Sequence, residues 1–142
     1  SNGNDIASAL QMGADLAYMG TRFINVNESM ADKSYQKMIM DSKAEDIIYT
    51  AAVSGVHASF LRPSLEAMGI TQELWKQTKK VDFGSELDHA KEEAKAWKTI
   101  WSAGQGVTSI SDVKPTGELI RLLKGEFEKA LLKQKDYHRY FF

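Results

Sequence analysis

Asp15-Leu16-Ala17-Tyr18-Met19-Gly20-Thr21-Arg22-Phe23 is the stretch that indicates the fold class. Residues 16–19 form a short apolar run, which is typical of a parallel strand covered on both faces. Gly20 ends the run, and because it has no Cβ the chain can turn sharply and a ligand can come close. Ligands of parallel α/β folds bind at the carboxyl ends of strands, so the sequence predicts a binding site at Gly20 and Thr21.

The residues before this run predict a helix over 4–12 that begins in a second glycine-containing loop. Asn2 or Asn4 can cap this helix, and Asp5 suits the positive end of its dipole. A helix N-terminus opened by a glycine loop is a ready anion site. Neither piece matches a Walker A motif or a complete dinucleotide fingerprint, and glycine turns often follow strands without any ligand. The residues alone therefore leave both a phosphate site and an ordinary turn open.

The composition narrows the class of protein. The chain has 142 residues, 43% hydrophobic residues and a formal net charge of −1, which suits a globular protein with a workable core. A basic excess that would favour nucleic acid is missing, and no apolar stretch is long enough to span a bilayer. Cysteine is absent, which excludes disulfides and cysteine chemistry. We expect neither nucleic acid nor a membrane as partner, and a cytoplasmic location.

The rest of the chain alternates predicted helices with one predicted strand. Apolar spacing, caps and glycine stops first predict a helix over 32–43, with Tyr35, Met38 and Ile39 inward, and a strand over 47–53. A helix within 58–68 that begins near Arg62 and Pro63 follows, and then a short helix over 71–80 and a turn at 82–84. The last predicted elements are a helix over 86–100, capped by Ser85, and a helix from 112–115 onward. The C-terminal residues 137–142 are unusually aromatic.

Several polar residues were weighed as site candidates. Arg22 could reach a phosphate, but a salt bridge that locks the turn is the favoured interpretation. Arg62 is expected on the solvated surface. His57 titrates near neutrality, as a general base would, and His89 has no companion at metal-ligand spacing, so no metal site is expected. Gly104-Gln105-Gly106 either lets the backbone approach a ligand or forms a flexible loop between helices.

Residues 2–23 closely resemble the nitronate monooxygenase family, formerly called 2-nitropropane dioxygenases, in its C-terminal portion. Members are FMN-dependent β/α-barrel enzymes related to the FMN-dependent enoyl-ACP reductases. In that family a Gly-Gly-Ile-x-x-Gly loop and its helix precede a strand that ends in Gln-Met-Gly-Thr-Arg-Phe, and both loops hold the FMN phosphate. Two later stretches match further family landmarks in the right order: Ser-Gly-Val-His-Ala at 54–58 and Ser-Ala-Gly-Gln-Gly-Val at 102–107.

The resemblance implies a role for several residues. FMN phosphate binding, mainly through backbone N–H groups, is implied for Gly3, Tyr18, Met19, Gly20 and Thr21. The family usually has Gln where Tyr18 stands, which affects a side-chain role there but not the backbone site.

The same resemblance places Gly104, Gln105 and Gly106 at the rim of the active site. The family's catalytic histidine lies upstream of this chain, so we expect no catalytic residue within it, and His57 is expected to be structural or exposed.

The expected fold is therefore α/β: the C-terminal part of an FMN-binding β/α (TIM) barrel followed by a mostly helical segment, with the chain itself predominantly α-helical. We expect residues 1–28 to form the last barrel units, 29–111 a helical substrate-side segment, and 112–142 a closing helix with an aromatic end. The chain begins at Ser1 inside a family motif, and a β/α barrel needs about 250 residues, so we expect a fragment of a longer enzyme.

The function implied by the resemblance is FMN-dependent oxidation of alkyl nitronates, of the propionate 3-nitronate type, with O₂. An enoyl-ACP reductase-like flavoenzyme is the alternative within the enzyme class. A non-catalytic interaction module built on the amphipathic helices over 85–100 and 116–133 is the alternative of another class. The aromatic end is expected to dock on the barrel or on another subunit, which would make the protein a homo-oligomer.

Overall fold

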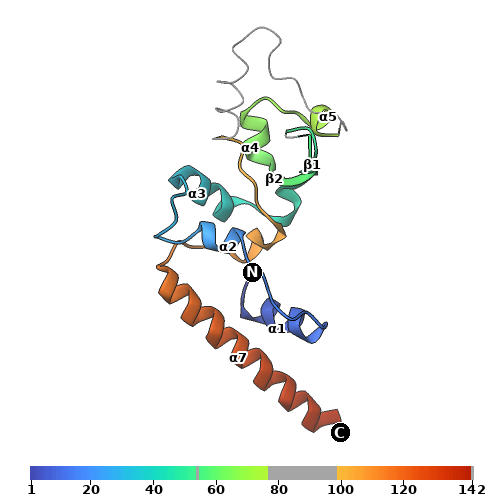
Figure 1. The fold of residues 1–142 in the computed structure, drawn as a ribbon, viewed down its shortest axis with the longest axis vertical. Coiled ribbons are helices and arrows are strands. Elements are labelled where there is room, and N and C mark those ends of the chain that lie inside the picture. Colours follow the sequence, from blue (N-terminus) through green and yellow to red (C-terminus); the bar gives the residue numbers. More distant parts are fainter. Residues whose placement is uncertain (54, 77–98, 142) are drawn as a thin grey trace.

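The computed structural model describes residues 1–53, 55–76 and 99–141. Its elements are α1 (Gly3–Gln11), α2 (Thr21–Ile24), α3 (Lys33–Asp41), the 3-10 turn η1 (Ala44–Asp46), β1 (Ile47–Thr50), β2 (Ala58–Leu61), α4 (Arg62–Ala67), α5 (Gln72–Trp75), the 3-10 turn η2 (Gln105–Ser109) and α7 (Thr116–Phe141). Figure 1 shows α1 and α7 at one end of the molecule, the strands with α4 and α5 at the other, and α2 and α3 between them. The described part is predominantly helical, as expected.

At the strand end, β1 and β2 form an antiparallel pair whose register runs from Ile47 opposite Leu61 to Thr50 opposite Ala58. The predicted strand over 47–53 is confirmed in its first four residues. Residues 58–61, which precede the helix start predicted near Arg62, form β2, a strand that was not predicted, because they pair with β1. Helix α4 then begins at Arg62 with proline in its first turn, as predicted.

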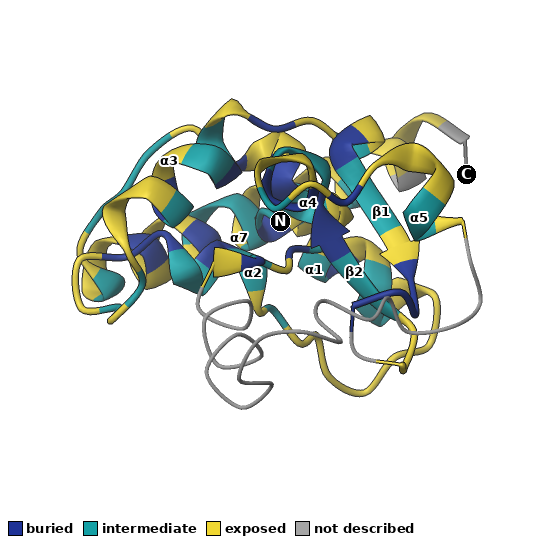
Figure 2. Ribbon diagram, turned by 90° about the horizontal axis from the view of Figure 1, so that it is seen from above, coloured by how far each residue is buried: buried dark blue, intermediate teal, exposed yellow. Residues whose placement is uncertain are grey.

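The hydrophobic core at the strand end and the core in the middle of the molecule are connected through β2. The strand-end core consists of Val53, Phe60, Leu65, Ile70 and Ile100. The middle core consists of Ile39, Leu61, Ala103, Val107 and Ile110. Figure 2 shows the buried positions of β2 and α4 where these two elements lie side by side. Because β2 contributes to both cores, it connects the hairpin with the middle of the molecule.

Helix α3 confirms the predicted apolar stripe. Asp32 caps it, because its carboxylate accepts a hydrogen bond of 2.7 Å from the Ser34 N–H. Ile39 is fully buried, and the partly buried Tyr35 and Met38 pack against the middle core. The ring of Tyr35 stacks on Trp101 with 5.1 Å between centroids, which ties α3 to the segment before η2.

At the opposite end α1 lies along α7 (Figure 1). Asn2 is the N-cap of α1: its side-chain oxygen accepts from the Asp5 N–H, and the Asp5 carboxylate accepts from the Asn2 N–H, each at 3.0 Å. A third core, made of Val26, Leu119 and Leu123, lies between these helices and α2. Helix α7 has 26 residues and α1 has nine, so α7 extends well beyond its partner.

The predicted strand over 16–19 is not a strand in this structure. These residues have no regular secondary structure, and the side chains of Leu16 and Tyr18 are 87% and 98% exposed. A parallel strand takes its hydrogen bonds and its cover from neighbouring strands and helices. Within the described residues the only sheet is the β1–β2 pair, which lies at the other end of the molecule, so the apolar run has no partner.

Some predictions fall outside the described residues: the helix over 86–100 with its cap Ser85, the turn at 82–84, His89, and the last part of the helix over 71–80. Its first part is present as α5. None of the helices that the structure describes is both long enough and apolar enough to cross a membrane. Tyr137 and Tyr140, near the end of α7, are 49% and 83% exposed, and their docking on another surface stays a prediction.

Candidate functional site

Two of the predicted site segments meet at one hollow beside α2, in the middle of the molecule. The hollow has a volume of about 340 Å³ and is lined by Gly20, Thr21, Ile24, Ser59, Ser102, Ala103 and Gly104. The N–H of Gly104 donates a hydrogen bond of 2.9 Å to the Thr21 hydroxyl oxygen, across 83 residues of sequence. The turn at Gly20-Thr21 and the segment before η2 are therefore directly connected.

Gly20 faces open space at this hollow. A Cβ added to Gly20 would meet no heavy atom within 4 Å. Its φ of −98° and ψ of −66° are ordinary right-handed values, so the bend of the chain at Gly20 does not need a backbone conformation that only glycine adopts easily. The structure supports a different role for this glycine: it leaves the space beside the backbone open. In the described part of the chain the N–H groups of Gly20 and Thr21 have no hydrogen-bond acceptor, so a ligand in that space could accept from them.

The lining of the hollow is uncharged but rich in donors. Thr21, Ser59 and Ser102 contribute hydroxyl groups. The backbone of Ser102 is anchored by Tyr35, whose hydroxyl donates a hydrogen bond to the Ser102 carbonyl oxygen. Burial raises the pKa of Tyr35, which keeps this phenol protonated as a donor. Backbone N–H groups and hydroxyls of this kind can hold an oxyanion without a cation.

Sequence reasoning missed Ser59 and the link between Thr21 and Gly104. Ser59 lies in β2, a strand that was not predicted. Small residues recur around 54–61, and Gly55 stands between two runs that contain β-branched or aromatic residues. This pattern was the available signal for a hairpin. Gly55 has a φ of +77°, which supports this reading of the turn.

Arg22 lies next to Thr21 in sequence but does not line the hollow. Its side chain is 4% exposed, and its Nη2 makes an ion pair of 2.9 Å with Asp112. Lys114 also pairs with Asp112, and these two cations hold the pKa of that carboxyl below its usual range, Lys114 more strongly. The salt-bridge interpretation of Arg22 is confirmed.

Gly3 lies apart from the hollow, against α7. Its N–H donates a hydrogen bond of 2.7 Å to the Glu126 carboxylate. A Cβ on Gly3 would overlap the Leu123 carbonyl oxygen and the Phe127 amide nitrogen. In this structure Gly3 permits the close approach of α1 and α7, and its N–H is bonded to Glu126, so its role at a phosphate stays a prediction.

The other predicted site residues lie around a neighbouring hollow of about 390 Å³ on the α1 side, lined by Ser1, Asp5, Ile6, Ala9, Leu16, Ala17, Tyr18, Met19 and Gly106. Tyr18 and Met19 thus meet Gly106 but not Gly104. Gln105 is exposed and begins η2, so the predicted flexible loop is a 3-10 turn. The resemblance places eight residues in the site, and six of them line these two hollows. Gly3 and Gln105 line neither.

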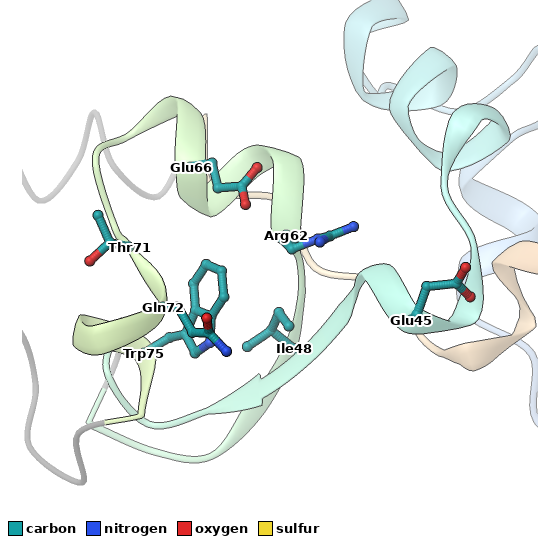
Figure 3. Close-up of a pocket in the computed structure, with 7 residues that line it drawn as sticks. All are labelled: Glu45, Ile48, Arg62, Glu66, Thr71, Gln72 and Trp75. Carbon is teal, nitrogen blue, oxygen red and sulfur yellow. The ribbon is translucent and has the colours of Figure 1, made fainter.

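A third hollow, of about 400 Å³, lies at the strand end (Figure 3) and is lined by Glu45, Ile48, Arg62, Glu66, Thr71, Gln72 and Trp75. Arg62 makes an ion pair with Asp46, and its side chain stays 43% exposed, in agreement with the expected position on the solvated surface. The hydrogen bond and charge of Asp46 raise the pKa of Arg62, while the Lys43 N–H and then Arg62 lower the pKa of Asp46. The hollow contains none of the residues that the resemblance implies for FMN.

The histidine that was weighed as a base lies away from these residues. His57 is exposed in the turn between β1 and β2, with its ring centroid 5.1 Å from that of Tyr49. It lines none of the three hollows described above. Among the residues that the structure describes, no three His, Cys, Asp or Glu side chains are grouped as they would be around a metal ion.

Comparison with known proteins identifies the family of this chain. The family described as nitronate monooxygenase matches residues 1–126. A curated nitronate monooxygenase from Paraburkholderia phytofirmans is 28% identical over 144 residues, which cover 96% of this chain and 38% of that protein, in its C-terminal part.

Two solved structures share the fold. FabK from Thermotoga maritima has a TM-score of 0.70 at 24% identity and is covered to 44% by 96% of this chain. Nitroalkane oxidase from Streptomyces ansochromogenes has a TM-score of 0.69 at 24% identity and is covered to 38% by 94% of this chain. Both are TIM barrels, and this chain spans about two fifths of the length of the relatives that it matches. With a family match over residues 1–126 and a fold that corresponds to part of these barrels, the chain belongs to the nitronate monooxygenase family.

Proposed function

We propose that this chain is the C-terminal part of an FMN-dependent oxidoreductase that oxidises alkyl nitronates, of the propionate 3-nitronate type, with O₂. The family match supports the activity. The observation that carries the proposal for this chain is the convergence of Gly20-Thr21 with Ser102–Gly104 on one uncharged, donor-lined hollow.

In this proposal the hollow takes the phosphate end of FMN. The N–H groups of Gly20 and Thr21 donate to phosphate oxygens, and the absence of a Cβ on Gly20 leaves room for them. The Thr21 hydroxyl already accepts a hydrogen bond from Gly104, so its own proton is free to be donated to the phosphate. Bound FMN supplies the redox chemistry, and the protein positions it.

The residues present fit a phosphate group better than a complete flavin. Three hydroxyls and two free N–H groups suit an oxyanion, and 340 Å³ is at the lower end of the range of about 300–1,000 Å³ for small-molecule pockets. Tyr18 and Met19, at the neighbouring hollow, precede the turn and extend the site along the chain. Walls for the isoalloxazine ring and the catalytic base would come from residues outside this chain.

An enoyl-ACP reductase-like flavoenzyme stays the second candidate. The likeness to FabK, with a TM-score of 0.70, is as good as the likeness to nitroalkane oxidase, with 0.69, so the fold does not choose between the two chemistries. The enoyl-ACP reductase activity needs a nicotinamide cofactor, whereas nitronate oxidation needs O₂. Oxygen consumption with propionate 3-nitronate, against NADH oxidation with a crotonyl thioester, separates the two activities in the longer protein that contains this chain.

The direct test of the site is a titration of the 142-residue chain with FMN, followed by flavin fluorescence. We expect no sub-micromolar binding, because the hollow offers contacts for the phosphate but few for the ring. Sub-micromolar binding by a monomer would mean that a complete flavin site lies within these residues. The longer protein should be yellow as purified; a colourless and folded longer protein that does not take up FMN would contradict the proposal, and would favour the interaction module.

A further inference from the structure

The segment that follows the Gly20-Thr21 turn is joined to the segment before α7 by a polar seam, which consists of residues 22–28 and 112–116. Besides the ion pair between Arg22 and Asp112, the Asn27 N–H donates to the Lys114 carbonyl oxygen at 3.1 Å, next to a parallel bridge between residues 26 and 114. The Glu28 carboxylate accepts from the N–H and the hydroxyl of Thr116 at 2.9 and 2.7 Å. The seam therefore joins α2 and the residues that follow it to the segment before α7.

Arg22 is the buried charged residue of this seam. Its Nη2 donates to the Asp112 carboxylate at 2.9 Å, and its Nη1 lies 3.4 Å from the carbonyl oxygens of Asn25 and Asp112. A guanidinium does not lose its charge in a protein, so at 4% exposure it depends on the opposite charge of Asp112. Arg22 directly follows Thr21 in a helix of only four residues, so the place of its side chain fixes the place of the turn.

A second link to α2 is the hydrogen bond from the Gly104 N–H to Thr21. The turn that lines the hollow is thus bonded to two segments that are distant in sequence: Thr21 accepts from the Gly104 N–H, and Arg22 pairs with Asp112. The polar contacts of the Arg22 guanidinium named above are with Asn25 and Asp112, and Arg22 is not among the residues that line the hollow.

We infer that Arg22 and Asp112 are positioning residues that set Gly20 and Thr21 for the phosphate, and that Arg22 does not bind the phosphate itself. This inference rests on the proposed function. The contrary hypothesis, that an arginine beside a phosphate turn is a direct ligand, predicts the opposite response to one substitution. Asp112→Asn weakens phosphate binding if Arg22 positions the turn, and strengthens it if the guanidinium is released to reach the phosphate.

The experiment uses the isotope-labelled 142-residue chain. FMN is added up to millimolar concentration, and the amide resonances of Gly20 and Thr21 are followed, with riboflavin as the ligand that lacks the phosphate. We expect FMN, but not riboflavin, to shift these resonances, and Asp112→Asn to weaken the apparent affinity by about tenfold, the size found when a partner that orients ligating groups is lost. Asp41→Asn is the matched control, because it removes a carboxylate from an exposed ion pair with Lys37.

Hydrogen exchange gives a readout that needs no ligand. The N–H of Gly104 donates to Thr21, and the N–H of Phe23 donates to the Gly20 carbonyl oxygen at 3.0 Å. Exchange at these two amides should become about tenfold faster in Asp112→Asn, while amides of β1 and β2 keep their wild-type rates, as expected for local rather than global opening. Asp41→Asn should change neither rate.

The outcomes separate the inference from the proposed function. Tighter FMN binding by Asp112→Asn, or unchanged exchange at Gly104 and Phe23, overturns the inference. If the wild-type chain shows no phosphate-dependent shift at Gly20 and Thr21, the proposed site fails, and the inference fails with it even where exchange shows that the pair holds the turn. Should Asp112→Asn not fold, Asp112→Glu replaces it: it keeps the charge but moves the guanidinium, and unchanged affinity in that variant overturns the inference.

Discussion

Gly3 is the first residue of α1, Gly20 directly precedes α2, and both were assigned to the same phosphate site from the sequence. Their surroundings are opposite. A Cβ on Gly3 would overlap the backbone of α7, and its N–H is bonded to Glu126. A Cβ on Gly20 would meet nothing within 4 Å, and the N–H groups beside it have no acceptor in the described part of the chain.

The comparison teaches that a missing side chain serves two physical purposes that a sequence pattern does not distinguish. At Gly3 the space is filled by another helix, so the glycine contributes to packing and to the stability of the fold. At Gly20 the space is open, so the glycine contributes nothing to packing and leaves room for a ligand. Substitutions at the two positions should therefore affect different measurements.

The largest expected effect is on folding. Gly3→Ala places a methyl group where the Leu123 carbonyl oxygen and the Phe127 amide nitrogen lie, and backbone atoms of a helix cannot rotate away. We expect the free energy of unfolding, measured by urea denaturation and circular dichroism, to fall by about 3 kcal/mol, the upper end of the usual cost of overpacking.

Gly125→Ala is the matched control, because Gly125 is in α7 and a Cβ there meets nothing within 4 Å. This variant should be more stable than wild type by about 0.5–1 kcal/mol, the difference in helix propensity between the two residues. If Gly3→Ala proves as stable as wild type, α1 and α7 do not pack as closely as the structure indicates.

The next effect concerns the ligand. In the longer protein, Gly20→Val should abolish or strongly reduce FMN retention, because the branched side chain occupies the space proposed for the phosphate. The reason is space alone, since the backbone angles of Gly20 are open to any residue. The stability of the apo-protein should change by no more than about 0.5 kcal/mol. The absorbance ratio of flavin to protein measures the effect, and unchanged stoichiometry in the purified variant removes Gly20 from the site.

The parts of the fold that the sequence predicts correctly depend on local chemistry. Asn2 as the cap of α1, one of the two predicted candidates, and the start of α4 beside Pro63 each need only residues within one helical turn. The backbone of a few neighbouring residues decides these features, so they do not require knowledge of the rest of the chain.

The parts that the sequence predicts wrongly depend on distant partners. The run over 16–19 has the composition of a covered strand, but strands exist only with neighbours, and the described residues supply none there. Conversely, 58–61 becomes a strand because it pairs with β1. A salt bridge was expected for Arg22, but no pattern points to Asp112 as its partner, 90 residues away.

A smaller effect is expected where the two site segments meet. Thr21→Val keeps the shape of the side chain but leaves the half-buried Gly104 N–H without its acceptor, which should cost about 1 kcal/mol in the free energy of unfolding. Thr21→Ser keeps the hydroxyl and should restore most of this stability. A valine variant as stable as the serine variant would mean that the hydrogen bond between Gly104 and Thr21 does not connect the segments in solution.

The smallest effect is expected at His57, which lies in the hairpin turn rather than beside the Gly20 hollow. The exposed imidazole contacts the ring of Tyr49 and lines none of the three hollows, so no proton on a ligand in them is within its reach. A general base typically contributes a factor of about 10²–10⁴ to the rate. We expect His57→Asn to leave kcat for propionate 3-nitronate in the longer protein within about twofold of wild type, far below the factor for a base. If kcat falls a hundredfold or more while flavin content and folding are normal, the base belongs to the hairpin, and the site extends from the Gly20 hollow to the strand end of the molecule.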